Sequence, residues 1–110
     1  AYCASKFGVI GFTQSLAREM AEHKVTVNAI CPSLVDTERV FGMASALKPD
    51  ADTSTEEWRD EMVAQTNANN PMGRIAQAKD VADVAAFLAS SQADYLTGLA
   101  INGAGGSYMG

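Results

Sequence analysis

Two side chains near the start of the chain could move a proton together. Tyr2 and Lys6 lie four positions apart, so on a helix their side chains project from one face about one turn apart. An ammonium group close to a phenol stabilises the phenolate and makes the hydroxyl a better acid near neutral pH. Such a phenol can give a proton to a carbonyl oxygen while hydride arrives at the carbon, or take the proton back in the reverse reaction. By residue type alone, the pair is also compatible with a solvated helix end.

A long amphipathic helix should position this pair. No proline interrupts the chain from Ser5 to about Glu22. Apolar residues recur there at steps of three and four, at Val9, Phe12, Leu16 and Met20. The next run, Val25 to Cys31, is rich in β-branched residues, and Pro32 ends it because proline cannot donate a ladder hydrogen bond. This run predicts a strand, and its lack of apolar–polar alternation favours burial on both faces of a parallel sheet.

Further helices are predicted in the second half of the chain. Ser54 followed by Glu57 is a capping-box pattern, which predicts a helix that runs to about Asn67. Asp80 can cap the next helix, in which apolar residues follow the i, i+3, i+4, i+7 pattern. Residues 33–53 mix turn formers with a short apolar patch and predict a loop that contains a marginal helix.

A short final strand, Leu99 to Asn102, completes the order of the elements. Helix, strand, irregular and helical segments, helix and strand alternate as expected of an α/β fold, with the two strands as parallel neighbours joined by a right-handed crossover. Two strands make a small sheet with exposed edges, and the chain begins at Ala1 rather than at a methionine. We therefore expect these residues to be part of a longer domain.

Composition and charge narrow the class of function. The 110 residues are 47% hydrophobic and 19% charged, which is ordinary for a soluble globular domain. A net charge of -5 argues against a nucleic-acid partner, and no apolar run is long enough to predict a membrane helix. Cys3 and Cys31 have neither the density of a disulfide scaffold nor the spacing of a zinc site. These features predict a reduced, cytoplasmic protein without a metal.

Motifs along the whole chain resemble the short-chain dehydrogenase/reductase family. The family's active-site helix has the pattern Tyr-x-Ala-Ser-Lys followed by small residues, matched here by Tyr2, Ala4, Ser5, Lys6, Gly8 and Gly11. The stretch VTVNAICPSLVDT, residues 25–37, is similar to the family's next strand and the loop that touches the nicotinamide. Further matches are the run Pro71 to Arg74, the run Leu96 to Gly98, and Ile101 to Gly103.

The resemblance implies an enzyme with a nicotinamide cofactor, either NAD or NADP. It would interconvert a secondary alcohol and a ketone or aldehyde by hydride transfer. By this resemblance, Tyr2 is the acid and base that exchanges the proton on the substrate oxygen. Lys6 tunes Tyr2 and holds ribose hydroxyls of the cofactor.

The same resemblance assigns a cofactor-binding role to the loop after the first strand. Pro32 would shape the floor under the nicotinamide, backbone groups at Val35 would meet the carboxamide, and the Thr37 hydroxyl would bond the carboxamide or a phosphate. Ser33 is part of this expected site, although family members usually have glycine there. That departure bears on the path of the loop, because glycine reaches backbone conformations that serine reaches only at a cost.

For the fold, the resemblance implies that residues 1–110 are the C-terminal part of one Rossmann-like domain with a doubly wound parallel sheet. Residues 38–70 would be a substrate flap within it. The family's glycine-rich turn, catalytic Ser, relay Asn and the residue that selects NAD or NADP would all precede Ala1. We therefore expect the 110-residue chain to be inactive alone, and the whole protein to act on a small alcohol or carbonyl as a homodimer or homotetramer.

Two alternatives stay open. One is a catalytically silent relative that serves as a binding or oligomer-assembly subunit, which the presence of both Tyr2 and Lys6 disfavours. The other is an epimerase or dehydratase of the extended branch, which also uses a Tyr-x-x-x-Lys pair. The continuation into CPSLVDT fits the single-domain reductase branch better.

Overall fold

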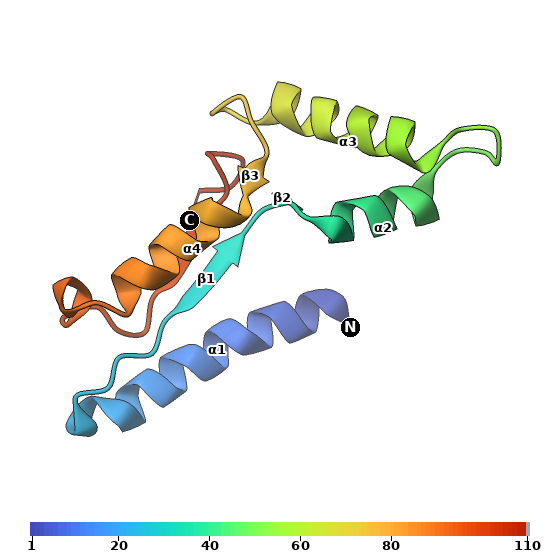
Figure 1. Ribbon diagram of the computed structural model, residues 1–110. Coiled ribbons are helices and arrows are strands. Elements are labelled where there is room, and N and C mark those ends of the chain that lie inside the picture. Colours follow the sequence, from blue (N-terminus) through green and yellow to red (C-terminus); the bar gives the residue numbers. More distant parts are fainter. Residues whose placement is uncertain (110) are drawn as a thin grey trace. The chain divides into compact units, whose positions relative to one another are not determined.

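The computed structural model describes residues 1–109 and has an α/β fold (Figure 1). Its elements in chain order are α1 (Tyr2–Met20), η1 (Ala21–His23), β1 (Ala29–Pro32), β2 (Val35–Asp36), α2 (Glu38–Leu47), α3 (Thr55–Asn69), β3 (Ala76–Gln77), α4 (Ala78–Leu88), η2 (Ser91–Ala93) and β4 (Ala100–Gly103). The alternation of helices and strands confirms the predicted fold class.

The chain divides into two compact units. The first consists of residues 1–31 and 82–101, and the second of residues 32–81 together with the chain from Asn102 onward. The divisions at 31/32 and 101/102 fall within β1 and β4, so each of these strands contributes residues to both units. Each unit is described by itself below.

Helix α1 confirms the long helix predicted at the start of the chain. It begins at Tyr2, three residues earlier than expected, and ends at Met20; the 3-10 turn η1 follows and ends where Lys24 adopts a left-handed conformation with φ 58°. The apolar side of this helix is not its buried side among the described residues. Val9 and Phe12 are 55% and 66% exposed, whereas Thr13 and Ala17 are the buried positions of the helix. The apolar pattern therefore identified the helix but not the side that this chain covers.

Strand β1 is shorter than the sequence predicts and includes Pro32. Val27 and Asn28 lie outside the strand because they bond instead to the turn before β4: the Val27 N–H donates to the Thr97 hydroxyl and the Asn28 amide donates to the Leu96 carbonyl. Such side-chain hydrogen bonds compete with a strand ladder. The expected burial on both faces is also wrong in this chain, because Ala29 is the one buried residue of β1.

Strands β1 and β4 pair side by side, as predicted. The Ala29 N–H donates to the Leu99 carbonyl, and the Ser33 N–H donates to the Gly103 carbonyl. Both partners advance together along the sequence, which is the order of a parallel pair. The prediction that these two strands are parallel neighbours is therefore confirmed.

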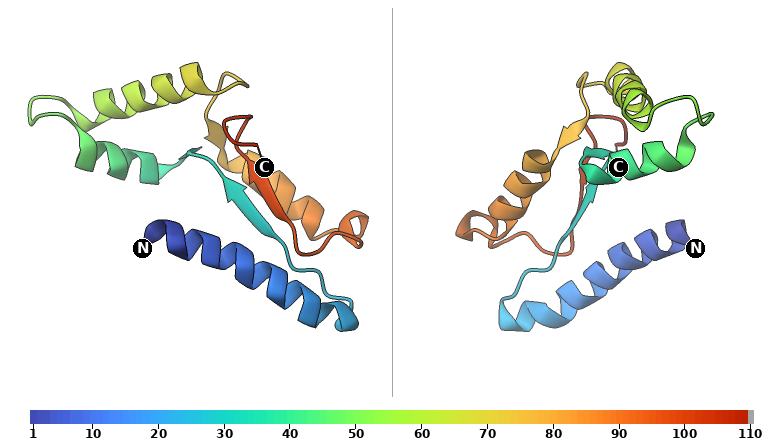
Figure 2. Two further views of the ribbon diagram at one scale, coloured as in Figure 1. Left: turned by 180° about the vertical axis from the view of Figure 1, so that it is seen from behind. Right: turned by 45° about the vertical axis from the view of Figure 1, so that its right-hand side comes forward.

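In the second unit, α2 and α3 form a helical hairpin, shown side by side in Figures 1 and 2. The segment expected to hold a marginal helix forms the ten-residue α2, whose Val40 and Ala44 are fully buried one turn apart. The hairpin is flanked by two short parallel strands that the sequence did not reveal, with Val35 opposite Ala76 in β2 and β3. Two-residue strands are too short to show a period.

The starts of α3 and α4 rest on side-chain caps. The Ser54 hydroxyl accepts a hydrogen bond from the Glu57 N–H at 3.1 Å, which confirms the predicted cap of α3. Helix α4 begins at Ala78, two residues before the predicted start. Asp80 is its third residue rather than its N-cap, and its carboxylate accepts the Gln77 N–H at 2.7 Å. This contact is the second half of a capping box.

The core of the described chain is small. Its buried apolar residues are Ala17, Ala29, Val40, Ala44, Ile75, Ala93 and Ala104. None of the helices in the described part is long and apolar enough to cross a membrane. Residues 1–109 also contain no cluster of three or more His, Cys, Asp or Glu side chains that could hold a metal ion.

Candidate active site

Tyr2 and Lys6 lie together at the start of α1, in the first unit. The Lys6 Nζ is 5.3 Å from the centroid of the Tyr2 ring, which is within the range of a cation–π contact. The Ser5 hydroxyl donates to the Tyr2 carbonyl at 2.7 Å, and the Ser5 N–H donates to the Ala1 carbonyl at 3.0 Å, so the first turn is closed locally. This geometry confirms that the two side chains share one face.

The Tyr2 side chain is open to an incoming molecule. The residue is 64% exposed, and its phenolic oxygen has no hydrogen-bond partner among residues 1–109. A phenol without an internal partner can bond to a substrate oxygen. The arrangement is therefore able to donate a proton to, or accept one from, an oxygen that reaches the first turn of α1.

Four of the five residues expected to contact the cofactor lie in the second unit, from the end of β1 to the start of α2, whereas Lys6 lies in the first unit. Pro32 ends β1 and is exposed, while Val35 begins β2. Thr37 is the N-cap residue of α2 in an extended conformation, and its carbonyl accepts the Val40 N–H at 2.9 Å. The Thr37 hydroxyl does not cap the helix but lies 3.5 Å from the Val35 carbonyl. An exposed hydroxyl with so long a contact is available to another group.

The serine that replaces the family's usual glycine fits this loop without strain. Lys24 is the single non-glycine residue with a positive φ in the described part of the chain, so Ser33 adopts an ordinary backbone conformation. Its N–H donates to the Gly103 carbonyl at 3.3 Å, which ties the loop to the end of β4. The loop therefore needs no glycine at this position.

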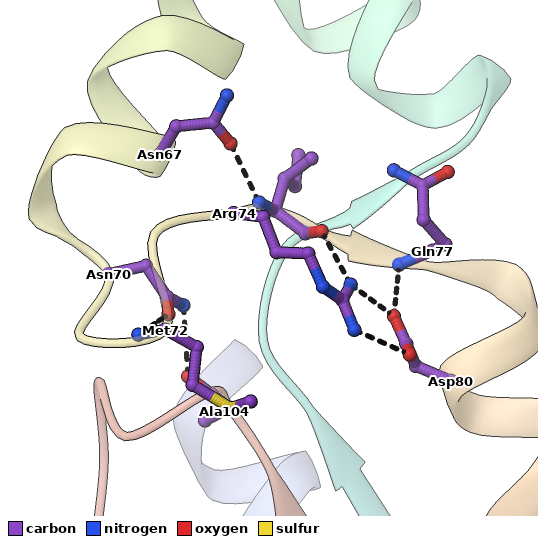
Figure 3. A network of polar contacts seen from close by, with 8 residues as sticks. Asn67, Asn70, Met72, Arg74, Gln77, Asp80 and Ala104 are labelled. Carbon is purple, nitrogen blue, oxygen red and sulfur yellow. Dashed lines mark hydrogen bonds and ion pairs between the residues drawn. The ribbon is translucent and has the colours of Figure 1, made fainter.

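A network of polar contacts that the sequence did not reveal surrounds the segment from Asn67 to Asp80 (Figure 3). Asn70 is 7% exposed. Its amide nitrogen donates to the Ala104 carbonyl at 3.2 Å, and its amide oxygen accepts the Met72 N–H at 2.8 Å. Gly105 has φ +57°, and a Cβ there would lie 2.6 Å from the Asn70 amide oxygen. No local pattern of residues around Asn70 predicts this long-range contact.

Arg74 and Asp80 form a two-pronged ion pair in the same network (Figure 3). The guanidinium Nη1 and Nη2 lie 2.6 and 2.8 Å from the two carboxylate oxygens. The Arg74 guanidinium first, and the Gln77 N–H second, hold the pKa of Asp80 well below its usual value of 3.8. The hydrogen bonds to Asp80 and its charge raise the pKa of Arg74. The pair fastens the loop after α3 to the start of α4.

Two further features of the second unit were not foreseen. Arg59 of α3 forms an ion pair with Asp36 of β2, and this bond raises the pKa of the arginine. An open cavity of about 330 Å³ is lined by Met62, Gln65, Thr66, Asn69 and Ser107. None of the residues expected to act in catalysis or cofactor binding lines this cavity.

Comparison with known proteins identifies the family. Residues 1–107 match the family model described as enoyl-(acyl carrier protein) reductase. The crystal structure of a short-chain dehydrogenase family protein from Francisella tularensis subsp. tularensis superposes with a TM-score of 0.84 at 31% identity, covering 96% of this chain and 42% of that one. This chain belongs to the short-chain dehydrogenase/reductase family.

Other short-chain dehydrogenases/reductases give a consistent picture. The 3-oxoacyl-[acyl-carrier-protein] reductase FabG of Haemophilus influenzae is 40% identical over 108 residues, which are 98% of this chain and 38% of the relative. A 3-oxoacyl-[acyl-carrier-protein] reductase with bound NAD from Brucella melitensis has a TM-score of 0.74 at 33% identity and covers 99% of this chain and 34% of that one. The chain thus spans between about one third and two fifths of the length of such proteins, and their structures confirm the predicted Rossmann-like class.

Proposed function

We propose that these residues are the C-terminal part of an NAD(P)-dependent oxidoreductase that interconverts a secondary alcohol and a ketone or aldehyde. The observation that carries the proposal is the Lys6 ammonium group 5.3 Å from the Tyr2 ring, on an exposed helical turn of a short-chain dehydrogenase/reductase.

Tyr2 and Lys6 have different roles in the proposed reaction. The Tyr2 hydroxyl donates a proton to the carbonyl oxygen as hydride reaches the carbon, and Tyr2 accepts the proton again when the alcohol is oxidised. Lys6 stabilises the phenolate that remains and holds ribose hydroxyls of the cofactor. When bound, NAD or NADP supplies or accepts the hydride.

Residues 32–37 are the proposed binding segment for the nicotinamide. Its chemistry fits, because Thr37 offers an exposed hydroxyl and Ser33 holds an unstrained backbone. Pro32 shapes the floor and Val35 offers backbone groups to the carboxamide. The NAD-bound relative from Brucella melitensis supports this class of cofactor, and we keep both NAD and NADP as candidates.

The α2–α3 hairpin, residues 38–69, corresponds to the proposed substrate flap over 38–70. A hairpin that leaves the cofactor segment at Glu38 and returns at Asn69 could close over a substrate bound next to the nicotinamide. The name of the Haemophilus influenzae relative makes 3-oxoacyl groups the first substrates to test.

The apolar surface of α1 supports the proposal that the chain works within a larger, oligomeric protein. Phe7 and Phe12 are 72% and 66% exposed on this helix, and patches of this kind mark surfaces that another part of a protein or a partner covers. We propose that the rest of the domain and a second copy, in a homodimer or homotetramer in the cytoplasm, provide this cover.

The test is a nicotinamide absorbance assay of the full-length protein against 3-oxoacyl thioesters, ketones, sugars, polyols and hydroxy acids. We expect one carbonyl or alcohol consumed for each cofactor converted, and no turnover by the 110-residue chain alone. A full-length protein that binds neither NAD(H) nor NADP(H) would refute the proposal and favour a silent binding or assembly subunit.

A further inference from the structure

Asp36 and Arg59 connect β2 to α3 across 23 positions of the sequence. The Arg59 Nη2 lies 2.5 Å from the Asp36 Oδ1, and the two side chains are 31% and 23% exposed. Both groups are charged, and their partial burial leaves the bond less screened by solvent than a fully exposed ion pair. Arg59 also contacts its neighbour Asp60 at 3.1 Å, but that carboxylate is 76% exposed. The half-buried contact is therefore the stronger restraint.

Asp36 lies within the segment proposed to bind the cofactor. Asp36 stands between Val35 and Thr37, the two residues proposed to meet the nicotinamide carboxamide. Successive side chains of an extended segment point to opposite faces, so the side chain that reaches Arg59 leaves the other face to its two neighbours. On its backbone edge, Asp36 lies opposite Gln77 of β3. The same residue thus links the proposed cofactor segment to the sheet and to the hairpin.

We propose that the Asp36–Arg59 bond positions the α2–α3 hairpin on the segment that holds the nicotinamide, so that cofactor binding and hairpin placement depend on each other. The inference rests on the proposed function, because it requires Val35 and Thr37 to touch the cofactor. A cofactor that orders this segment favours the hairpin position in which Arg59 reaches Asp36. By reciprocity, loss of the bond weakens cofactor binding. Asp36 and Arg59 are positioning residues, since neither touches the cofactor.

The experiment compares Asp36→Asn, Arg59→Met and the double variant in the full-length protein. For each, the KM for NADH and NADPH, kcat at saturating cofactor and the unfolding midpoint are measured. We expect the cofactor KM to rise about fivefold in both single variants, with kcat changed less than about twofold. The double variant should be no worse than either single one, because all three lack the same interaction.

Asp60→Asn is the matched control. It removes a carboxylate from the same arginine but keeps the contact with Asp36, so its cofactor KM should stay at the wild-type value. The proposal is overturned if Asp36→Asn lowers the unfolding midpoint and leaves the cofactor KM unchanged, since this is the behaviour of a purely structural pair. It is also overturned if Asp60→Asn raises the KM as much as Asp36→Asn.

Measuring cofactor binding by the wild-type protein distinguishes failure of this inference from failure of the proposed function. A wild-type protein that binds no nicotinamide cofactor refutes the proposed function, and the inference with it. Wild-type binding with unaffected variants refutes the inference alone. If Asp36→Asn does not fold, Arg59→Met carries the same comparison from the hairpin side, with Asp60→Asn still as its control.

Discussion

The first turn of α1 and the segment from Asn67 to Asp80 use polar side chains in opposite ways. Tyr2 is 64% exposed, and its hydroxyl has no partner among the described residues. Asn70, in contrast, is 7% exposed and bonds through both atoms of its amide. Buried polar groups need hydrogen-bond partners within the protein, whereas a group that acts on a substrate must keep a hydrogen-bonding position free for it. We infer that the first region carries the chemistry and the second the restraint.

Removal of the Lys6 charge should lower kcat, and this is the largest effect that we expect. In the full-length protein, Lys6→Met takes away the charge beside Tyr2, and we expect kcat to fall about 100-fold, as for the loss of one preorganised electrostatic contact. Steady-state kinetics at saturating substrate would measure it, with Lys24→Met as a control of equal charge change at the other end of the helix. Equal losses in the two variants would contradict a specific role for Lys6.

A methyl group at Gly105 should destabilise the turn that Asn70 holds. Gly105→Ala requires a side chain at φ +57° and within 2.6 Å of the Asn70 amide oxygen, so we expect a loss of about 1–3 kcal/mol in the free energy of unfolding. Chemical denaturation would measure this loss. Gly42→Ala is the control, because no atom lies within 4 Å of its built Cβ and it sits within α2. A tolerated Gly105→Ala would show that the amide does not restrain this turn.

Loss of the Arg74–Asp80 ion pair should have the smallest effect on stability. Its side chains are 52% and 40% exposed, and solvent screens such pairs. The folded pKa of Asp80 lies below 3.8, so the contribution is complete above the unfolded value and is lost as pH falls below it. Asp80→Asn should lower the unfolding midpoint slightly near neutral pH, and the gap to wild type should begin to narrow as the pH falls below about 4. Asp94→Asn is the control, and a gap that grows with acid would contradict this sign.

Local patterns predicted the features that depend on nearby residues. The spacing of Tyr2 and Lys6 placed them on one face, and Ser54 with Glu57 marked the start of α3. Parallel pairing of the strands around Ala29 and Ala100 followed from the order of the elements. Each of these depends on contacts within one or two turns, or on topology, which periodicity and capping residues encode.

Contacts between distant positions could not be predicted in this way. Asn70 meets residues 34 and 37 positions away, and Arg59 meets Asp36 across 23 positions. The strand expected from Val25 begins late because Asn28 bonds to the turn before β4, which no local pattern reveals. Such side-chain contacts depend on the packed fold, so they become visible only in the structure.

We propose that Tyr2 exchanges the proton on the substrate oxygen. The most direct test is the turnover of full-length Tyr2→Phe beside Tyr95→Phe, because Tyr95 is a fully exposed tyrosine of the same unit. We predict that Tyr2→Phe loses at least about 100-fold in kcat while still binding the cofactor, and that Tyr95→Phe keeps wild-type activity. Equal turnover by Tyr2→Phe and wild type would contradict the assignment.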